Sequence, residues 1–307
     1  MRRDLPEPEL VENTKTMSQS DTANSDPART ISFQGAPGAY SHLACRHAFP
    51  EFEAWACPTF EDAFAAVTEG RAAQAMIPID NSVAGRVADI HHLMPDSGLY
   101  IIGEHFQAVN HQLLVVPGTK LEQIEAVHSH IHAIGQTRKT LLGLGLSPRI
   151  HADTAGSARD VAKWADPAHA SVASTLAAEI YGLEILKSDI EDAGHNTTRF
   201  VVLSTDPVQT EADPGKVMTT FVFNVRNVPA ALYKAMGGFA TNGVNMVKLE
   251  SYQLGGSFNA TQFYADIIGH PEDKSVRLAL EELEFFTSRI KIMGVYPMAP
   301  FRDSDIY

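Results

Sequence analysis

Cysteine is scarce in this chain of 307 residues, which has only Cys45 and Cys57. Two cysteines cannot build the disulfide framework of a small secreted domain, and neither stands at a zinc-ligand spacing. No apolar run is long enough to cross a bilayer, and the polar first 29 residues lack the apolar core of a signal peptide. We therefore expect a soluble, cytoplasmic protein whose residues 1–29 form a mobile tail.

Positive charge is also in short supply. There are 24 lysines and arginines against 37 aspartates and glutamates, which gives a net charge of -13. Broad nucleic-acid binding needs clustered basic residues, so the composition argues against it. Binding of an anionic small molecule is not excluded. Salt screens the repulsion from distant negative charges, so one arginine close to the ligand can outweigh them.

The length exceeds that of one typical hydrophobic core, so two domains are expected. In residues 30–205, strand-like runs such as TISFQ, AAQAMIPI and RFVVLS alternate with helical periods. This alternation predicts an α/β fold with a mainly parallel sheet. Residues 206–216 hold two Asp-Pro pairs and no apolar period, which indicates a linker.

The pattern changes in residues 217–298. The predicted order there is strand, helix, strand, strand, helix, strand, the βαββαβ order of a ferredoxin-like unit. Residues 299–307 are left as a C-terminal tail. The chain is thus expected to have an α/β region followed by a smaller ferredoxin-like domain.

Polar residues follow two of the predicted strands, in GAPGAYS (35–41) and IPIDNS (77–82). Each stretch alone is best interpreted as a turn or a helix cap. Helix starts also expose N–H groups that suit carboxylates, and ligands of open α/β sheets bind at the carboxyl ends of strands. The two stretches together therefore favour a shared cleft.

Three histidines alternate in VHSHIHAIGQ, namely His128, His130 and His132. On a strand they would share one face, which would suit zinc. No carboxylate or thiolate completes the set at a usual spacing, so metal binding is the less favoured interpretation. Hydrogen bonding by Ser129 and His130 at a strand-to-helix turn is preferred.

The stretch GHNTTRF precedes an apolar strand. Arg199 can bind a carboxylate through two parallel hydrogen bonds. Thr198 can donate a proton or a hydrogen bond to an oxygen. The alternative is a polar turn with Arg199 in solvent.

Four stretches together, GAPGAYS, IPIDNS, SHIHAIGQ and NTTRF, resemble bacterial prephenate dehydratases in their order and spacing. PAALYKAMGGFATNGVNMVKLES and IKIMGVYP resemble the ACT domain that follows them in that family. The resemblance spans residues 30–298. It implies two α/β lobes similar to a periplasmic binding protein, with the site in the cleft between them, followed by a ferredoxin-like ACT domain.

The resemblance also implies an activity. Prephenate would lose water and carbon dioxide to give phenylpyruvate, without a metal or an organic cofactor. The enzyme would be a homodimer or homotetramer, with phenylalanine as a possible effector at the ACT interfaces. No nucleic acid or membrane partner is expected.

The same resemblance assigns roles to residues. Thr198 would be catalytic, by hydrogen bonding to the leaving oxygen. Arg199 and the N–H groups near Gly38 and Ser82 would hold the two carboxylates, and Phe200 would line the apolar side of the cleft. The implied substrate-binding residues are Gly38, Ser41, Asn81, Ser82, Ser129, His130, Gln136, Ser174, Asn196, Arg199 and Phe200. The implied effector-binding residues are Ala230, Ala231, Leu232, Glu250 and Ser251.

This chain departs from the family pattern at several positions. Asp80 stands where glutamate is usual, and Ala39, His132 and Thr137 replace threonine, glutamine and cysteine. We expect activity to survive these changes. In the effector motifs, Ala230 adds a methyl group where glycine is usual, and the usual arginine after Ser251 is missing. Inhibition by phenylalanine is therefore a weaker expectation than catalysis.

Two other functions remain open. Arogenate dehydratase performs the same elimination on a substrate that carries an ammonium group in place of the keto group. A non-catalytic amino-acid sensor could combine the same domains. A secreted solute receptor is disfavoured by the missing signal peptide, and no chorismate mutase helix bundle is expected before residue 30.

Overall fold

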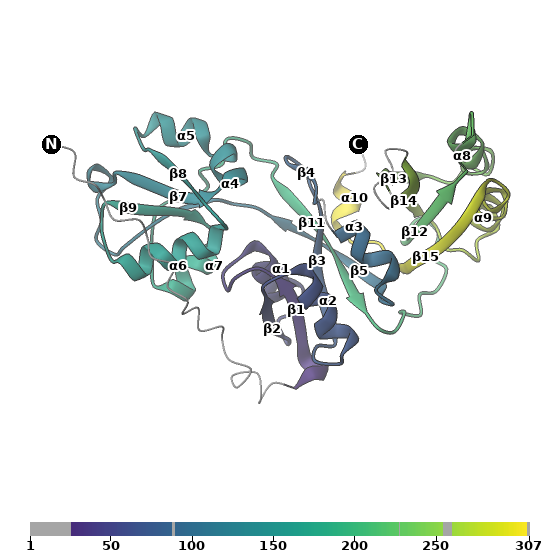
Figure 1. Ribbon diagram of the computed structural model, residues 1–307, viewed down its shortest axis with the longest axis horizontal. Coiled ribbons are helices and arrows are strands. Elements are labelled where there is room, and N and C mark those ends of the chain that lie inside the picture. The colour runs from purple at the N-terminus through teal and green to yellow at the C-terminus, as the bar shows by residue number, and fades with distance from the viewer. Residues whose placement is uncertain (1–25, 88–89, 227, 254–259, 306–307) are drawn as a thin grey trace.

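The computed structural model describes residues 26–87, 90–226, 228–253 and 260–305. Within these ranges the chain forms three sheets that stand in a row, with helices packed on them (Figure 1). The middle unit is called lobe 1, the unit at the left of Figure 1 is lobe 2, and the unit at the right is the C-terminal domain. The tail predicted for residues 1–29 lies outside the described residues except for a short 3₁₀ helix, Pro27–Arg29.

Lobe 1 is built on a mixed sheet with the strand order β2-β1-β3-β11-β5, and β4 pairs with β3. Strand β1 is parallel to β2 and β3, whereas β11 is antiparallel to both β3 and β5. Its elements are β1 (Thr30–Gln34), α1 (Tyr40–Ala48), β2 (Glu53–Cys57), α2 (Phe60–Thr68), β3 (Gln74–Asn81), β4 (Gly85–Arg86), α3 (Ile90–Leu93), a 3₁₀ helix (Met94–Asp96), β5 (Tyr100–Ala108) and β11 (Thr197–Ser204).

Lobe 2 repeats this plan with the strand order β10-β6-β9-β7-β8. Strand β7 is parallel to β8 and β9, whereas β6 is antiparallel to β9 and β10. The prediction of a mainly parallel sheet is therefore confirmed for the strands β1, β2 and β3 and for β7, β8 and β9, whereas β11 and β6 run antiparallel to both of their neighbours. Its elements are β6 (Gln112–Val115), a 3₁₀ helix (Leu121–Gln123), β7 (Ala126–His130), α4 (Ile131–Gln136), α5 (Arg138–Gly143), β8 (Pro148–His151), α6 (Thr154–Trp164), β9 (His169–Ala173), α7 (Thr175–Tyr181) and β10 (Glu184–Lys187).

The chain passes between the lobes twice. Residues 109–111 form the first crossing, from β5 to β6, and residues 188–196 form the second, from β10 back to β11. Because β11 returns from lobe 2 into the sheet of lobe 1, its first residues lie at the boundary between the lobes. This topology places the NTTRF stretch beside the end of β3, where Thr198 pairs with Asn81.

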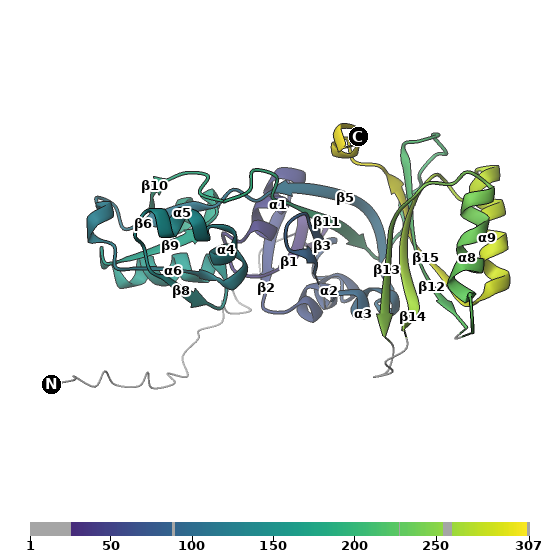
Figure 2. The same cartoon turned by 90° about the horizontal axis from the view of Figure 1, so that it is seen from above.

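The C-terminal domain has the predicted βαββαβ order and the strand order β13-β14-β12-β15. Its two long helices cover the face of the sheet that points away from lobe 1 (Figure 2). Its elements are β12 (Val217–Val225), α8 (Ala231–Thr241), β13 (Met246–Gln253), β14 (Ala260–Ile268), α9 (Lys274–Phe286) and β15 (Thr287–Pro297), and a short helix α10 (Phe301–Asp305) follows.

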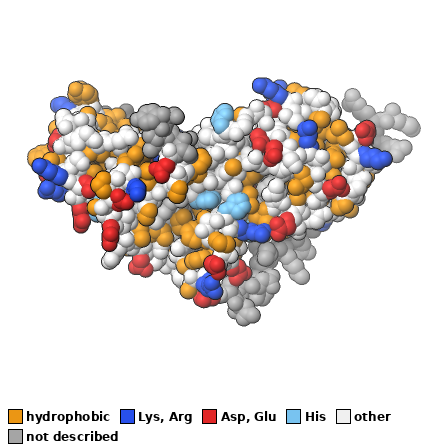
Figure 3. All heavy atoms as spheres, turned by 180° about the vertical axis from the view of Figure 1, so that it is seen from behind, with side chains coloured by type: hydrophobic (Ala, Val, Ile, Leu, Met, Phe, Trp, Pro, Cys, Tyr) orange, Lys and Arg blue, Asp and Glu red, His pale blue; other side chains and the backbone are white. Residues whose placement is uncertain are grey.

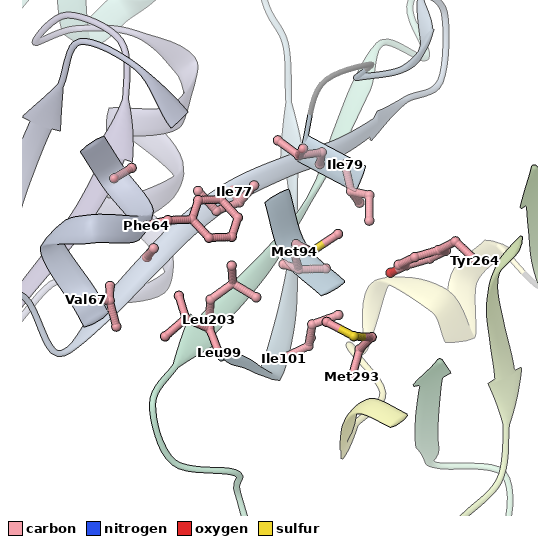
Figure 4. Close-up of a cluster of buried hydrophobic side chains, with 14 of the residues drawn as sticks. Phe64, Val67, Ile77, Ile79, Met94, Leu99, Ile101, Leu203, Tyr264 and Met293 are labelled. Carbon is pink, nitrogen blue, oxygen red and sulfur yellow. The ribbon is translucent and has the colours of Figure 1, made fainter. Parts of the chain in front are cut away.

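Lobe 1 and the C-terminal domain share one hydrophobic core. Buried side chains of lobe 1 such as Ile79 and Ile101 belong to the same cluster as Tyr264 and Met293 of the C-terminal domain (Figure 4). A Cβ atom at Gly294 would collide with the carbonyl group of Ile101, so the two backbones approach closely there. Each fully buried side chain of this size contributes about 1.5–3 kcal/mol, and the two units are therefore firmly attached.

Local sequence signals account for several element ends. A capping box begins α2, in which Thr59 accepts from the Asp62 N–H and the Asp62 carboxylate accepts from the Thr59 N–H. The helical segment after His130 is divided into α4 and α5, because Thr137 leaves helical geometry between them. After Asn81, Gly85 and Arg86 fold back along β3 as β4, and α3 follows.

The surface seen in Figure 3 carries acidic and basic side chains interspersed with one another. Charge of one sign is therefore not concentrated on that face. No helix within the described part of the chain is long and apolar enough to cross a membrane.

Candidate active site

A cavity of about 390 Å³ lies between the two lobes. Its volume falls in the range that accommodates small organic ligands. Lobe 1, lobe 2 and the first crossing all contribute to its wall. The lining residues are Tyr40, Asn81, Ala84, Gly85, Arg86, Val87, Val109, His111, His130, His132, Ala133, Gln136, Thr154 and Thr198.

Asn81 orients the hydroxyl group of Thr198. The Asn81 Oδ1 atom accepts from the backbone N–H groups of Val83 at 3.0 Å and Ala84 at 2.7 Å. Since backbone N–H groups can only donate, the Nδ2 side of this amide must point the other way, and it donates to Thr198 Oγ1 at 3.0 Å. The Thr198 oxygen therefore accepts, and its own hydrogen can be directed to an acceptor in the cavity.

A series of hydrogen bonds continues from Asn81 across the cavity. Asn81 Nδ2 donates to Asn196 Oδ1 at 2.8 Å, and Asn196 Nδ2 donates to Gln136 Oε1 at 3.0 Å. His111 Nε2 lies 2.8 Å from the same Gln136 oxygen, and His111 Nδ1 lies 2.9 Å from the Tyr40 hydroxyl. The series joins both lobes and both crossings.

Sequence reasoning missed Tyr40 as a site residue, and it missed His111 altogether. Tyr40 stands inside the GAPGAYS stretch that was singled out, but His111 opens an ordinary apolar strand, HQLLVV. No spacing marks it. Only the fold brings the first crossing against Gln136.

Burial favours the neutral form of two imidazoles on the cavity wall, by lowering the pKa of His111 and of His130. It lowers the pKa of His111, which is opposed by the hydrogen bond to Gln136 and the charge of Glu191. Burial also lowers the pKa of His130, and the neighbouring His132 lowers it further. These neutral rings can donate or accept single hydrogen bonds but cannot neutralise a substrate anion.

Arg86 is a guanidinium group on the cavity wall that sequence reasoning did not assign. It lies on β4, which folds back along the end of β3. Its Cζ atom lies 5.3 Å from the ring centroid of Tyr252, and its Nη1 atom donates to the Ser251 carbonyl at 3.5 Å. Arg86 therefore lies between the cavity and strand β13 of the C-terminal domain.

Arg199 does not point into this cavity, which corrects the expectation that it holds a substrate carboxylate. Its side chain is 6% exposed, and its Nε atom donates to Glu104 at 2.8 Å. Its Nη1 atom donates to Asp266 at 2.5 Å and its Nη2 atom to the Tyr296 hydroxyl at 3.1 Å. The guanidinium group thus attaches lobe 1 to the C-terminal domain.

The reason is strand geometry. The structure starts β11 at Thr197, two residues before the predicted strand. Successive side chains on a strand point to opposite faces, so Thr198 and Arg199 cannot share a cleft. Burial disfavours the charged form of Arg199, but the carboxylates of Asp266 and Glu104 outweigh it and raise the pKa of Arg199 further above its usual range.

A second cavity, of about 590 Å³, lies on this other face of the sheet. It is lined by Asp80, Asn81, Ser82, Phe106, His195, Thr197, Arg199, Val247, Lys248, Phe301 and Arg302. Lys248 Nζ bridges Asp80 at 2.5 Å and Glu250 at 2.6 Å. Asp80, the shorter residue where glutamate is usual, is thereby paired across the interface with the C-terminal domain.

Gly38 and Ser174 connect the lobes. Ser174 Oγ donates to the Gly38 carbonyl at 2.5 Å and caps α7 by accepting from the Ala177 N–H at 3.0 Å. Gly38 has a φ of +90°, and a Cβ atom there would meet Ala177. The Gly38 N–H donates to His42 Nδ1 at 3.1 Å, so the expectation that it is offered to a carboxylate is corrected.

Three other expected site residues lie elsewhere. Ser129 is fully buried and donates to the Val172 carbonyl at 2.6 Å inside lobe 2. Phe200 is buried beside Phe33 in the core of lobe 1, so it does not line the cleft. Ser82 joins β3 to the second crossing and to the start of β11. Its Oγ donates to the His195 carbonyl at 2.6 Å and accepts from the Thr197 N–H. Its backbone N–H donates to the Thr197 carbonyl.

The other expected positions have mixed outcomes. Asn81, His130, Gln136 and Thr198 line the cavity. Asn196 reaches it through its bonds to Asn81 and Gln136. Ser41 lies in the first turn of α1 and is half-buried.

The expected effector residues lie in two parts of the C-terminal domain. Ala230 is the N-cap of α8, with a φ of 62° that favours glycine. Ala231 and Leu232 begin α8. Glu250 and Ser251 lie on β13, where the Glu250 carboxylate accepts from Lys248 and the Ser251 carbonyl accepts from Arg86 of lobe 1.

The three alternating histidines do not share one face. His128 and His130 lie on β7, but His132 is on α4. His128 Nε2 lies 3.2 Å from His169 Nδ1, away from the His130–His132 pair. Within the described residues, no group of three or more His, Cys, Asp or Glu side chains is placed to hold a metal ion.

Comparison with known proteins agrees with this two-lobed arrangement. The family model described as prephenate dehydratase matches residues 31–208. The chain belongs to the prephenate dehydratase family. The expectation from the sequence motifs is confirmed at this level.

Relatives of the family cover nearly the whole chain. A Komagataeibacter europaeus protein named bifunctional N-acyl-homoserine lactone acylase/prephenate dehydratase is 52% identical over 274 residues, which are 89% of this chain and 98% of that protein. Arogenate dehydratase/prephenate dehydratase 1, chloroplastic, of Arabidopsis thaliana is 38% identical over 309 residues, 96% of this chain and 77% of that protein. The solved prephenate dehydratase of Arthrobacter aurescens in complex with L-Phe is 28% identical, with a TM-score of 0.80 over 90% of this chain and 97% of that one.

Proposed function

We propose that this protein converts prephenate into phenylpyruvate in the biosynthesis of L-phenylalanine. The observation that carries the proposal is the Thr198 hydroxyl, oriented by Asn81 toward a cavity between two lobes. Membership of the prephenate dehydratase family supports it.

The reaction needs little covalent chemistry from the protein. The bond between the ring and its carboxylate breaks to release carbon dioxide, and that electron pair enters the ring. The ring carbon–oxygen bond breaks, and the departing hydroxide takes up one proton to become water. Because the ring becomes aromatic, the protein has only to orient the dianion and assist the leaving oxygen.

Thr198 assists the departing oxygen in this proposal. Its oxygen accepts from the Asn81 amide, so its hydrogen points to the oxygen that gains negative charge. One preorganised donor of this kind accounts for about a hundredfold to a thousandfold in rate. A threonine hydroxyl is a poor acid, so the role assigned is hydrogen bonding and not proton transfer.

Arg86 takes the role that the sequence assigned to Arg199. It lines the cavity, whereas the Arg199 guanidinium is used by Glu104 and Asp266. A guanidinium group can hold a carboxylate through two parallel hydrogen bonds. Removal of the ring carboxylate from water favours the loss of carbon dioxide, because it destabilises the anion relative to the neutral product.

The test is direct. Purified protein is incubated with prephenate, and phenylpyruvate is measured. Enzymatic formation of phenylpyruvate at a rate well above the solution reaction is expected. A protein that binds prephenate without turnover would instead support the non-catalytic sensor.

Arogenate remains the alternative substrate. The Arabidopsis relative is named for both activities, and the described lining residues of the cavity include no carboxylate that would pair with an ammonium group. Competition between the two substrates measures the ratio of their kcat/KM values. A ratio in favour of arogenate would replace prephenate in this proposal.

Acyl hydrolysis, which the name of the Komagataeibacter relative includes, is not proposed for this chain. A threonine nucleophile needs a neighbouring base that takes its proton. Among the described residues, the side chain in hydrogen-bond contact with the Thr198 oxygen is the Asn81 amide, which is no base.

The C-terminal domain is proposed to be an ACT regulatory domain that responds to phenylalanine. Its βαββαβ order supports this assignment. Ser251 and Tyr252 of the expected effector motif contact Arg86, which gives that domain a route to the cavity wall. Adding phenylalanine is expected to lower turnover, and unchanged kinetics over a wide phenylalanine range would contradict this role.

A homo-oligomer is proposed through the same domain. Tyr233 on α8 is 81% exposed and Phe285 on α9 is 82% exposed. Two large exposed rings on the outer helices suit a contact with a second copy. Light scattering on the purified protein would measure the mass, and a monomer would contradict this assignment.

A further inference from the structure

The series of hydrogen bonds across the cavity has a fixed direction. At one end, two backbone N–H groups hold the Asn81 oxygen. Asn81 must then donate to Asn196, Asn196 must donate to Gln136, and the Gln136 oxygen faces His111 Nε2. A carbonyl oxygen can only accept, so Nε2 of His111 must carry a hydrogen.

The same direction also determines that Nδ1, the other nitrogen of the His111 ring, carries no hydrogen when the ring is neutral. A neutral imidazole that carries its hydrogen on Nε2 accepts at Nδ1. The Tyr40 hydroxyl lies 2.9 Å from Nδ1 and can donate to it. The Asn110 carbonyl, also 2.9 Å from that hydroxyl, is an alternative acceptor for it, so Tyr40 fixes the ring less strictly than Gln136 does.

We propose that His111 is a positioning residue for the dehydration: its Nε2–H donates to Gln136 in the direction that Asn81 imposes on the series, and so stabilises the arrangement that leaves the Thr198 hydrogen available to the substrate. His111 does not touch the reacting atoms. It acts through Gln136, Asn196 and Asn81. The proposal rests on the proposed function, because it concerns the same Thr198 hydroxyl.

If a hydrogen-bond acceptor replaced the Nε2–H group, the hydrogen bonds of the series could not all form. Gln136 would turn its amide to donate to position 111, and Asn196 would turn in response. The Asn196 nitrogen would then face the Asn81 nitrogen at the 2.8 Å that now separates Asn81 Nδ2 from Asn196 Oδ1, which would place two donors in contact. Asn81 cannot turn, because Val83 and Ala84 hold its oxygen. One bond must break, and Asn81 or Thr198 would lose its position.

The place of His111 in the fold explains why a single ring can do this. It ends the first crossing, and Asn196 ends the second, so the series joins the two connections between the lobes. His111 is 2% exposed. The charged neighbours are Glu191, whose carboxylate accepts the His111 backbone N–H at 2.8 Å, and Asp189, which binds the side chain of Gln112.

The experiment compares His111→Gln with His111→Glu. These two substitutions have the same shape, and only the glutamine can donate to Gln136 while the introduced carboxyl group is ionised. His111→Gln is expected to keep kcat within about tenfold of the parent, and His111→Glu to lose a further tenfold to hundredfold in kcat at pH 8, with a similar KM.

A pH series adds a readout that a purely structural role would not produce. A protonated carboxyl group donates, so the kcat of His111→Glu is expected to rise toward that of His111→Gln as the pH falls. Burial and Glu191 both raise the pKa of the introduced carboxyl group, which brings this recovery into an accessible range. Equal kcat values for the two variants, or no recovery at low pH, would overturn the proposal.

A measurement on the parent protein separates this inference from the proposed function. Nitrogen NMR of ¹⁵N-histidine-labelled protein identifies which ring nitrogen of His111 carries the hydrogen, with His111→Gln used to assign the signal. The Nε2–H form is expected whether or not prephenate is the substrate. The Nδ1–H form would overturn the inference, whereas failure to form phenylpyruvate would overturn the proposed function.

Discussion

The two faces of strand β11 hold their neighbours by different means. On the face toward the cavity, Thr198 belongs to a series of amide and hydroxyl groups without formal charge. On the opposite face, Arg199 is buried among the carboxylates of Glu104 and Asp266, and Glu104 also binds Arg302 of α10. One residue therefore separates a neutral network from an ionic one.

The difference follows from what each face has to do. Neutral hydrogen bonds have a direction, so they can fix which way a catalytic hydrogen points, and they cost little to bury when all partners are present. Buried ions are strongly destabilising when one partner is removed. They attach a domain, but their charge would compete with a dianionic substrate if they faced the cavity.

The largest expected effect comes from breaking the ionic face. Arg199→Met removes the cation and leaves Glu104 and Asp266 buried without it. Loss of one partner of a buried ion pair lowers the free energy of unfolding by about 3–5 kcal/mol. Urea unfolding measures the change. The matched control is Arg46→Met, which removes an exposed pair with Glu179 and should cost less than about 1 kcal/mol.

The opposite result would restore the role predicted from the sequence. If Arg199→Met leaves the urea midpoint unchanged and raises the KM for prephenate, Arg199 holds the substrate. The comparison between the two faces would then be wrong.

The neutral face is tested by Thr198→Val, which replaces the hydroxyl with a methyl group of similar size. We expect kcat for prephenate to fall about a hundredfold to a thousandfold, because one preorganised donor is lost. The free energy of unfolding should change far less than for Arg199→Met. Steady-state kinetics check the first statement, and Thr198→Ser, which restores the hydroxyl, should recover most of the rate. A parent-like kcat for Thr198→Val would remove Thr198 from the mechanism.

A smaller effect is expected at the cavity wall. Arg86→Gln removes the proposed carboxylate ligand, and a charge-assisted hydrogen bond contributes about 1.5–3 kcal/mol. The KM for prephenate should therefore rise at least about tenfold, with a smaller change in kcat. Arg71→Gln is the control, since Arg71 pairs with Glu69 and lies over Trp55, outside the lining of the cavity. An unchanged KM for Arg86→Gln would show that another group holds the carboxylates.

The smallest effect is expected where the second crossing joins β3. Ser82→Ala removes the bonds to the His195 carbonyl and the Thr197 N–H. The free energy of unfolding should fall by about 1–2 kcal/mol, because typical hydrogen bonds contribute about 0.5–1.5 kcal/mol each. Urea unfolding measures this, and kcat should fall less than for Thr198→Val. A larger loss of kcat than in Thr198→Val would mean that Ser82 takes part in the chemistry itself.

Some of the site could be predicted from local patterns. Asn81, His130, Gln136 and Thr198 all line the cavity. Asn81 and His130 are the last residues of β3 and β7, as expected for ligand sites at the carboxyl ends of strands in α/β sheets. The same reasoning failed for Arg199, Ser129 and Phe200. It treated the neighbours of a motif as members of one site, although strand alternation sends them to different faces.

His111 and Arg86 could not be found in this way. His111 belongs to a crossing between lobes, and its function depends on a partner 25 residues away, on α4. Arg86 reaches the cavity only because β4 folds back along β3. Neither position has a local spacing that indicates its environment.

By itself the sequence determined the family, most of the succession of strands and helices, the βαββαβ order of the C-terminal domain and the identity of Thr198 as the hydroxyl to consider. Local propensity, period and motif are properties of neighbours along the chain, so they can be read without a fold. Only the tertiary structure decided that Arg199 faces the C-terminal domain and that His111 completes a directed series of hydrogen bonds. Those outcomes depend on which face of β11 meets which sheet, and on backbone donors that hold Asn81 in one orientation, and both are set by contacts between distant parts of the chain.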